Sequence, residues 1–142
     1  EINKILSTIE ALLVEKKLIV ENDINEDLIL RTDKESFRSI FSNLLNNAIK
    51  YSPIGSKIVF NAAKEKKSIV ISIKDNGYGI EKNSIKRVFE RFYRSSKARA
   101  HTKGTGLGLA LVKQPSSRIG ANVKVESQIN VGSEFFVSFQ DK

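Results

Sequence analysis

The strongest constraint on the fold is a change in the spacing of apolar residues near the middle of the chain. Over residues 37–49 they recur three and four positions apart, which places them along one side of a helix. Over 57–63 and 68–75 they alternate at every second position, which places them on one face of a strand. A helix with one apolar stripe and strands with one apolar face bury both by packing together. The pattern therefore predicts helices packed on one face of a sheet.

Residues at the ends of these segments, and the same spacings elsewhere in the chain, predict where the other helices and strands begin and end. Asp33 can cap the central helix, because its carboxylate can accept from the free N–H groups of the first turn, and the segment 52–55 ends that helix. The same spacings predict further helices over 2–16, over 84–91 and from Leu107 onward, and strands over 18–24, 28–32, 57–63, 68–75, 122–127 and 133–139. We therefore expect one domain over residues 1–142 with an α/β fold. It should be a two-layer α/β sandwich, a mixed sheet of about five or six strands with about three main helices on one face.

One residue conflicts with the helical pattern around it. Pro115 falls inside the helix predicted from Leu107, and an interior proline removes a backbone hydrogen bond at a cost of ~3 kcal/mol. We expect a kink or an early end of this helix near Pro115.

Composition excludes several classes of site. The chain has no cysteine and one histidine, His101, which we interpret as a solvated loop residue, so disulfides and Cys- or His-based metal sites are excluded. The formal net charge is +8, but the lysines are scattered with few aromatic residues among them. The scattered lysines argue against a nucleic-acid patch, and the same charge also suits an anionic ligand such as a nucleotide, but the charge alone does not identify the ligand. No apolar run reaches the ~20 residues of a membrane span, so we expect a cytoplasmic domain without membrane contact, in a full-length protein that can still be membrane-anchored.

A first polar cluster lies on the central helix. At about 100° per residue, the side chains of Asn43, Asn47, Lys50 and Tyr51 fall on one arc beside the apolar stripe, whereas Asn46 points toward solvent. An asparagine oxygen can ligate Mg²⁺, an ammonium group can offset phosphate charge, and an aromatic ring can flank a nucleotide. The cluster fits a magnesium–nucleotide site. The alternative is a polar helix flank that holds two asparagines by chance.

A second cluster, Asp75-Asn76-Gly77-Tyr78-Gly79-Ile80, directly follows a strand. Asp75 lies on the apolar face of that strand, where an unpaired carboxylate is costly. It can accept a hydrogen bond from the exocyclic amine of adenine, whereas guanine has a carbonyl at that place. The two glycines let the backbone approach a planar ring closely. An ordinary Asx turn is the alternative.

A third cluster, Gly104-Thr105-Gly106-Leu107-Gly108-Leu109, runs into a helix, where backbone N–H groups can bind phosphate. It matches neither the Walker A pattern nor the dinucleotide fingerprint, and a flexible loop is the alternative. Residues 88–94 lie between the second and third clusters. There Phe89 and Phe92 are spaced to pack a short helix onto the core, and Arg94 can reach a terminal phosphate with its planar guanidinium group.

In this order and spacing, the four segments resemble the N box, first glycine box, F box and second glycine box of the histidine kinase catalytic domain. In the GHKL ATPase superfamily these motifs surround the ATP site of the Bergerat fold. The resemblance extends over about residues 1–140, and it implies a Bergerat fold that binds ATP and Mg²⁺.

The resemblance also implies roles for single residues. Asn47 matches the asparagine that binds Mg²⁺, and Asp75 matches the aspartate that recognises adenine. Residues 93–106 match the ATP lid, which we expect to become ordered when nucleotide binds. Catalytic roles are implied for Asn43, Lys50 and Arg94. Nucleotide contacts are implied for Asn43, Asn47, Lys50, Tyr51, Asp75, Gly77, Gly79, Ile80, Tyr93, Arg94, Gly104, Thr105, Gly106, Leu107, Gly108 and Leu109.

Position 43 separates the members of the superfamily. Gyrase-type, mismatch-repair and heat-shock-chaperone ATPases, and the anti-sigma kinases, have a glutamate four residues before the magnesium asparagine, and that glutamate acts as a base. Here the position is Asn43, which cannot accept a proton at neutral pH. An uncharged residue favours transfer of the phosphoryl group to an imidazole over hydrolysis.

The resemblance therefore implies the catalytic domain of a two-component sensor histidine kinase. Such a domain transfers the γ-phosphoryl group of ATP to a histidine on a separate dimerisation domain of a homodimer, for onward transfer to the receiver domain of a response regulator. Nothing in the chain resembles that dimerisation domain, so the fragment alone should bind ATP and do little with it. The alternatives are a nucleotide-binding or protein-binding module without catalysis, and another GHKL ATPase.

Overall fold

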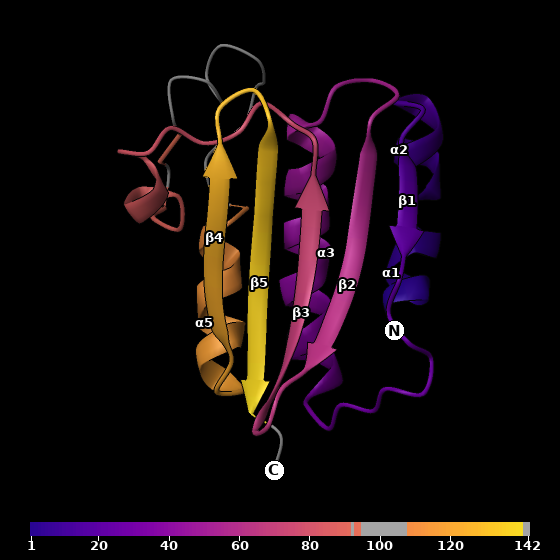
Figure 1. The fold of residues 1–142 in the computed structure, drawn as a ribbon, viewed down its shortest axis with the longest axis vertical. Helices are drawn as coiled ribbons and strands as arrows, with labels where there is room; N and C mark the ends of the chain where they lie inside the picture. The colour runs from indigo at the N-terminus through magenta and orange to yellow at the C-terminus, as the bar shows by residue number, and fades with distance from the viewer. Residues whose placement is uncertain (92, 95–107, 141–142) are drawn as a thin grey trace.

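The computed structural model describes residues 1–91, 93–94 and 108–140. Its strands are β1 (Ile19–Asn22), β2 (Lys57–Lys64), β3 (Ser68–Asp75), β4 (Asn122–Gln128) and β5 (Gly132–Gln140). In the described part of the chain they form one five-stranded sheet in the order β1-β2-β3-β5-β4 (Figure 1). The pair β1–β2 is parallel and the other pairs are antiparallel, so the sheet is mixed.

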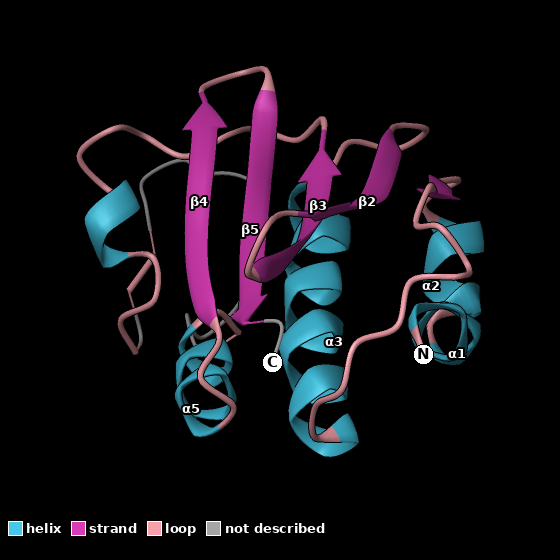
Figure 2. Cartoon of the chain, turned by 60° about the horizontal axis from the view of Figure 1, so that its bottom comes forward, coloured by secondary structure: helices cyan, strands magenta, loops and turns pink. Residues whose placement is uncertain are grey.

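The α-helices lie on one face of this sheet, as Figure 2 shows. The long helix α3 (Lys34–Tyr51) and the helix α5 (Ala110–Arg118) pack against each other beneath the sheet. Two short helices, α1 (Ile2–Thr8) and α2 (Glu10–Glu15), lie at the edge formed by β1. This arrangement confirms the predicted two-layer α/β sandwich.

The apolar stripe of α3 forms the centre of the core. Phe41 is fully buried, with its ring centroid 4.6 Å from that of Phe37 and 6.3 Å from that of Phe139. Alternate residues of β3 and β5 are buried with the stripe, namely Ile69, Ile71, Ile73, Phe135, Val137 and Phe139. At the start of α3, Oδ2 of Asp33 accepts a hydrogen bond from the Ser36 N–H at 2.9 Å, which confirms the predicted cap.

The single helix predicted over residues 2–16 is wrong, because the helix is broken at Ile9. That residue has a non-helical φ of −118° and separates α1 from α2. Just before it, Ser7 and Thr8 donate their hydroxyl groups to main-chain carbonyls about one turn earlier, at 3.0 and 2.7 Å. Hydroxyl groups that bond back in this way weaken a helical turn.

The strand predicted over residues 28–32 is also wrong. The alternation itself is correct, because Leu28 and Leu30 pack against the core while Ile29 is 77% exposed. A strand also needs a neighbour, and within the described residues the edge strand β1 pairs with β2 alone. The side chain of Asn25 accepts from the N–H two residues later, and this Asx turn directs the chain away from the sheet edge.

The short helix predicted over residues 84–91 is present as the 3₁₀ helix η1 (Ile85–Arg87), which is followed by turns. The N–H groups of residues 87, 90 and 93 each donate to the carbonyl three residues earlier, which is the 3₁₀ pattern. Phe89 packs onto the core as predicted, edge-on to Phe135 with ring centroids 6.1 Å apart. Phe92 lies outside the described residues.

Of the kink or early end predicted near Pro115, the early end is wrong, because α5 (Ala110–Arg118) continues through the proline. Val112 and Ser116 are buried on the helix face that meets the core, and the Ser116 hydroxyl donates to the Val112 carbonyl at 2.7 Å. Burial of this face outweighs the lost hydrogen bond of the proline. The helix ends instead before Gly120, whose φ of +67° is the left-handed conformation that glycine adopts at low cost.

Replacing Pro115 by alanine should raise the free energy of unfolding by about 2 kcal/mol, because it restores the interior N–H donor of α5. Urea unfolding of the nucleotide-free chain measures this difference. The neighbouring exposed residue provides the control, since Gln114→Ala should change the free energy of unfolding by less than about 0.5 kcal/mol. An unchanged or lower free energy of unfolding for Pro115→Ala would show that packing of the proline ring stabilises α5 at least as much as the lost hydrogen bond destabilises it.

Candidate nucleotide-binding site

The side chain of Asp75, at the end of β3, is the central polar group of the candidate site. It is 4% exposed and continues the buried face of Ile71 and Ile73. Its Oδ1 accepts hydrogen bonds from the N–H groups of Gly77 and Ser133, at 2.8 and 3.3 Å. Among the described residues, none donates a hydrogen bond to Oδ2. Burial raises the pKa of Asp75 to about 6, although the two N–H donors oppose the shift.

The turn after Asp75 is pressed against the end of α3. A Cβ atom on Gly77 would lie 2.5 Å from the carbonyl oxygen of Tyr51 and 2.8 Å from Oδ1 of Asp75. Beside this contact, the N–H of Tyr78 donates to the same Tyr51 carbonyl at 3.3 Å. A side chain at position 77 would therefore separate the carboxylate from the helix, so the first predicted glycine is required by close packing.

The other side of this turn contacts the loop between β4 and β5. Gly79 has a φ of +79°, and a Cβ atom there would overlap the backbone of Gln128. The N–H of Asn130 donates to the Tyr78 carbonyl at 2.8 Å, and the N–H of Ile80 donates to the Ser127 hydroxyl at 2.7 Å. The segment 76–80 is thus held between a helix end and a hairpin.

Sequence reasoning missed the two serines that support Asp75. The Ser127 hydroxyl donates to the Gly132 carbonyl at 3.0 Å and lies 2.7 Å from the Ser133 hydroxyl, while the Ser133 main chain bonds to Asp75. The only signal for these serines in the sequence is that they flank the turn of the predicted hairpin, one at the end of its first strand and one at the start of its second. Their link to Asp75 depends on the pairing of Asp75 with Ser133 between β3 and β5, which is a long-range register.

The polar cluster on α3 has the predicted orientation. Asn43 and Asn47 are half-buried, whereas Asn46 is exposed. The Asn43 amide nitrogen donates to the carbonyl of residue 39 at 2.7 Å, which fixes its side chain against the preceding turn. The Lys50 ammonium lies 5.5 Å from the centroid of the Tyr51 ring. Because Tyr51 also contacts Gly77, α3 brings this cluster to the Asp75 turn.

The structure describes part of the predicted phosphate side of the site. The Tyr93 hydroxyl donates to the Ser84 hydroxyl at 2.6 Å, and the Arg87 guanidinium carbon lies 4.5 Å from the centroid of the Tyr93 ring. Arg94 and Leu109 are half-buried and Gly108 is exposed. Of the other predicted residues, Gly104, Thr105, Gly106, Leu107 and His101 lie outside the described residues, as does the predicted lid apart from residues 93–94.

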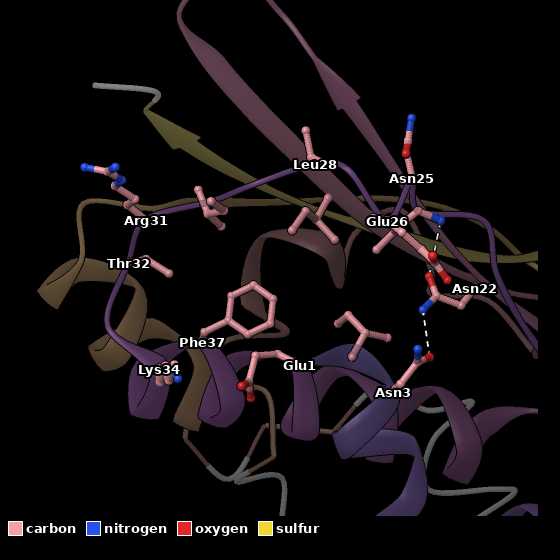
Figure 3. A pocket seen from close by; sticks show the side chains of 14 residues that line it. Glu1, Asn3, Asn22, Asn25, Glu26, Leu28, Arg31, Thr32, Lys34 and Phe37 are labelled. Atoms are coloured by element: carbon pink, nitrogen blue, oxygen red, sulfur yellow. Dashed lines mark hydrogen bonds between the residues drawn. The ribbon is translucent and has the colours of Figure 1, made fainter.

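A separate cavity of about 620 Å³ lies away from these residues (Figure 3). It is formed where the segment 22–34 crosses between β1 and the first turn of α3 without joining the sheet. Its walls are apolar at the centre and polar at the rim, lined by Glu1, Ile2, Asn3, Asn22, Ile24, Asn25, Glu26, Leu28, Leu30, Arg31, Thr32, Lys34, Phe37 and Ile71. None of the predicted site residues lines this cavity, so it is not the candidate nucleotide site.

The described residues lack two kinds of feature. Among them, no group of three or more His, Cys, Asp or Glu side chains could hold a metal ion. A cation at the α3 cluster would therefore need ligand oxygens from a bound nucleotide in addition to asparagine. In the same part of the chain, no helix has the length and apolar character needed to cross a membrane.

The chain is similar to known proteins over most of its length. Residues 32–142 match the family described as Histidine kinase-, DNA gyrase B-, and HSP90-like ATPase. The sensor histidine kinase WalK of Bacillus subtilis (strain 168) is 37% identical over 111 residues, which cover 76% of this chain and 18% of WalK. The chain therefore spans less than a fifth of the length of that relative.

Solved structures show the same architecture. The mycobacterial sensor histidine kinase MprB has a TM-score of 0.82 and 25% identity, with 98% of this chain and 95% of that chain covered. Full-length ShkA in complex with AMPPNP has a TM-score of 0.81 and 26% identity, with 96% of this chain and 28% of that chain covered. These similarities confirm the predicted fold class and family.

Asp75→Asn should stabilise the nucleotide-free domain above pH 6. A carboxyl group whose pKa rises from 3.8 to about 6 on folding keeps its proton in the folded state while the unfolded state loses it. The free energy of unfolding of the natural protein therefore falls by up to roughly 3 kcal/mol as pH rises between these two values. Asparagine has no charge and avoids that loss, and its side-chain oxygen can still accept from the two N–H donors. Urea unfolding at pH 4 and pH 8 measures the difference.

The exposed Asp27 provides the control, since Asp27→Asn should change the free energy of unfolding little at either pH. The advantage of Asp75→Asn over the natural protein should be present at pH 8 and largely absent at pH 4. An equal difference at both pH values would contradict the assignment of the cost to the buried charge.

Proposed function

The chain belongs to the family of histidine kinase-, DNA gyrase B- and HSP90-like ATPases, and we propose that it is the ATP-binding catalytic domain of a sensor histidine kinase. One observation carries the proposal. Asp75 is buried with Oδ1 satisfied by two N–H groups, while among the described residues no group donates to Oδ2. Burial of the charged side chain is costly, and a ligand that supplies an N–H donor to Oδ2 would offset part of this cost.

Adenine is the ligand that fits this carboxylate. Oδ2 of Asp75 would accept from its exocyclic amine, and Gly77 lets the turn pack closely against the Tyr51 carbonyl beside this carboxylate. Guanine would present a carbonyl to the carboxylate, and the two acceptors would repel each other. The acceptor character of Asp75 therefore supports recognition of adenine nucleotides over guanine nucleotides.

The α3 cluster would bind the phosphate end of the nucleotide. Asn47 is half-buried on the same flank as Asn43, and its side-chain oxygen can occupy one Mg²⁺ position while phosphates and water occupy the others. The ammonium group of Lys50 would offset phosphate charge, and Arg94 would contact the γ-phosphoryl group. The bound Mg²⁺ would supply charge neutralisation on the phosphates. These residues position and stabilise charge rather than react covalently.

Position 43 supports a kinase over a hydrolase. The amide nitrogen of Asn43 donates to the main chain, and its side chain has no group that could take a proton from water at neutral pH. The acceptor would instead be the imidazole of a histidine on a dimerisation domain. A sensor kinase of this kind would form a homodimer and pass the phosphoryl group to the receiver domain of a response regulator. The similarity to relatives named sensor histidine kinases supports a function of this kind.

The direct test combines binding with phosphoryl transfer. Calorimetric titration with ATP, with and without Mg²⁺, should show binding that Mg²⁺ strengthens. Addition of a histidine-bearing helical domain and γ-labelled ATP should then place the label on histidine. Release of inorganic phosphate without labelled histidine would indicate an ATPase of the same family instead. Binding without either reaction would indicate a nucleotide-binding module.

Asn47→Ala should weaken Mg²⁺-ATP binding by at least about tenfold, whereas Asn46→Ala should change it by less than about twofold. The two residues are adjacent and chemically identical, but Asn47 lies on the half-buried flank and Asn46 faces solvent. Calorimetry with and without Mg²⁺ compares them, and the loss in Asn47→Ala should be confined to the Mg²⁺-dependent part. Equal effects of the two substitutions would refute this assignment of helix faces.

Asp75→Asn should weaken ATP binding by about 10- to 100-fold, because an asparagine cannot offer two charged oxygens to the adenine amine and the Gly77 turn together. Its preference for ATP over GTP should fall as well. The urea unfolding proposed above for the same variant would establish that it remains folded. Calorimetry that gives the natural affinity and the natural preference would exclude Asp75 as the adenine-recognition residue.

A further inference from the structure

The carboxyl end of α3 has an unusual set of hydrogen-bond partners. A helix leaves its last four carbonyl groups without partners in the helix, and α3 is followed by Ser52, which is extended, rather than by a left-handed glycine. Ser52 supplies part of the cap, because its hydroxyl donates to the carbonyl of residue 48 and its N–H donates to the carbonyl of residue 49. The Tyr51 carbonyl receives the N–H of Tyr78.

Lys16 supplies the rest of this cap from a distant part of the sequence. Its ammonium group donates to the carbonyls of Ile49, Lys50 and Ser52, at 2.6, 3.3 and 2.9 Å. A positive charge at the carboxyl end of a helix also interacts favourably with the helix dipole. With Lys16 included, each of the last four carbonyls of α3 has a partner, and the carbonyls of residues 49–51 have partners from distant parts of the sequence.

The main chain of Lys16 is also hydrogen-bonded near the end of α3. The residue follows α2, and its carbonyl accepts from the N–H of Gly55 at 3.0 Å, just beyond α3. The side chain is partly buried, and burial lowers the pKa of its ammonium group from the usual range. Three carbonyl acceptors offset this loss of hydration. Neighbouring Lys17 is exposed, and none of the described residues accepts a hydrogen bond from its side chain.

We propose that Lys16 is a positioning residue for the nucleotide site, because its ammonium group holds the end of α3 on which Lys50, Tyr51 and the Gly77 turn depend. The inference rests on the proposed function. Lys16 does not contact the Asp75 turn directly, and its influence passes through the last turn of α3. Without the ammonium group, that turn would fray, Lys50 would lose its fixed position, and the Tyr51 carbonyl would no longer be held against Gly77 and Tyr78.

Matched substitutions of two adjacent lysines test the proposal. Lys16→Met and Lys17→Met remove the same charge one residue apart. At a temperature far below unfolding, Lys16→Met should weaken Mg²⁺-ATP binding by about tenfold, and Lys17→Met by less than about twofold. Hydrogen exchange of the Tyr78 amide, which bonds to Tyr51, should accelerate in Lys16→Met alone. Thermal unfolding without nucleotide establishes that each variant is folded during the binding measurement.

The absence of cysteine from the chain permits a chemical rescue. Lys16→Cys should show the same loss as Lys16→Met. Alkylation of this single thiol with 2-bromoethylamine restores an ammonium group on a side chain of nearly the length of lysine, and it should recover Mg²⁺-ATP affinity to within about twofold of the natural protein. Alkylation with iodoacetamide adds a neutral group of similar size and should not.

Either of two results would overturn the proposal. One is a lower unfolding temperature for Lys16→Met with unchanged Mg²⁺-ATP affinity and unchanged Tyr78 exchange, which would make Lys16 a stabilising cap only. The other is a loss of affinity that the restored ammonium group does not reverse. If the natural protein bound no Mg²⁺-ATP, the proposed function would fail. The Tyr78 exchange would then decide alone whether Lys16 positions the glycine turn.

Discussion

Burial of the apolar stripe of α3 against β3 and β5 determines where the polar groups of this domain meet. The stripe includes Phe41, whose ring packs in one cluster with the rings of Phe37 and Phe139, and it is buried where the helix runs along these strands. In that position the last turn of α3 lies beside the end of β3. The Tyr51 carbonyl then contacts Gly77, so the apolar core brings together two polar clusters that are separated in the sequence.

The same packing explains why a carboxylate is buried at the end of β3. Asp75 continues the alternation of Ile71 and Ile73, so its side chain points inward whatever its chemistry. The fold compensates one oxygen with two main-chain N–H groups, and it raises the pKa of the residue to about 6. We therefore expect the nucleotide-free domain to be less stable at neutral pH than it would be with a neutral side chain at this position. Such a cost is typical of a residue kept for binding rather than for folding.

Local signals predicted much of the fold and of the site. The strands predicted at 57–63 and 68–75, the cap at Asp33 and the faces of Asn46 and Asn47 each depend on spacing within one segment, and the structure agrees with all of them to within one residue. The wrong predictions concern segments whose structure is determined by contacts with residues far away in the sequence. The segment 28–32 has the alternation of a strand but no neighbouring strand to pair with, and α5 continues through its proline because its inner face is buried. The serines beneath Asp75 were missed for the same reason, since only the strand register brings them there.

The two ends of α3 show how far a sequence can be interpreted in this way. At the start, Asp33 caps the helix through an N–H three residues away, so the cap can be predicted from four consecutive residues. At the other end, the ammonium group comes from Lys16, more than thirty residues earlier, and the remaining outside donor comes from Tyr78 on the Asp75 turn. The polar cluster lies toward the end whose cap comes from other elements. Because α2, α3 and the Asp75 turn all contribute to that cap, a change in any one of them alters the geometry of the others. A helix end capped by its own sequence would not couple these elements.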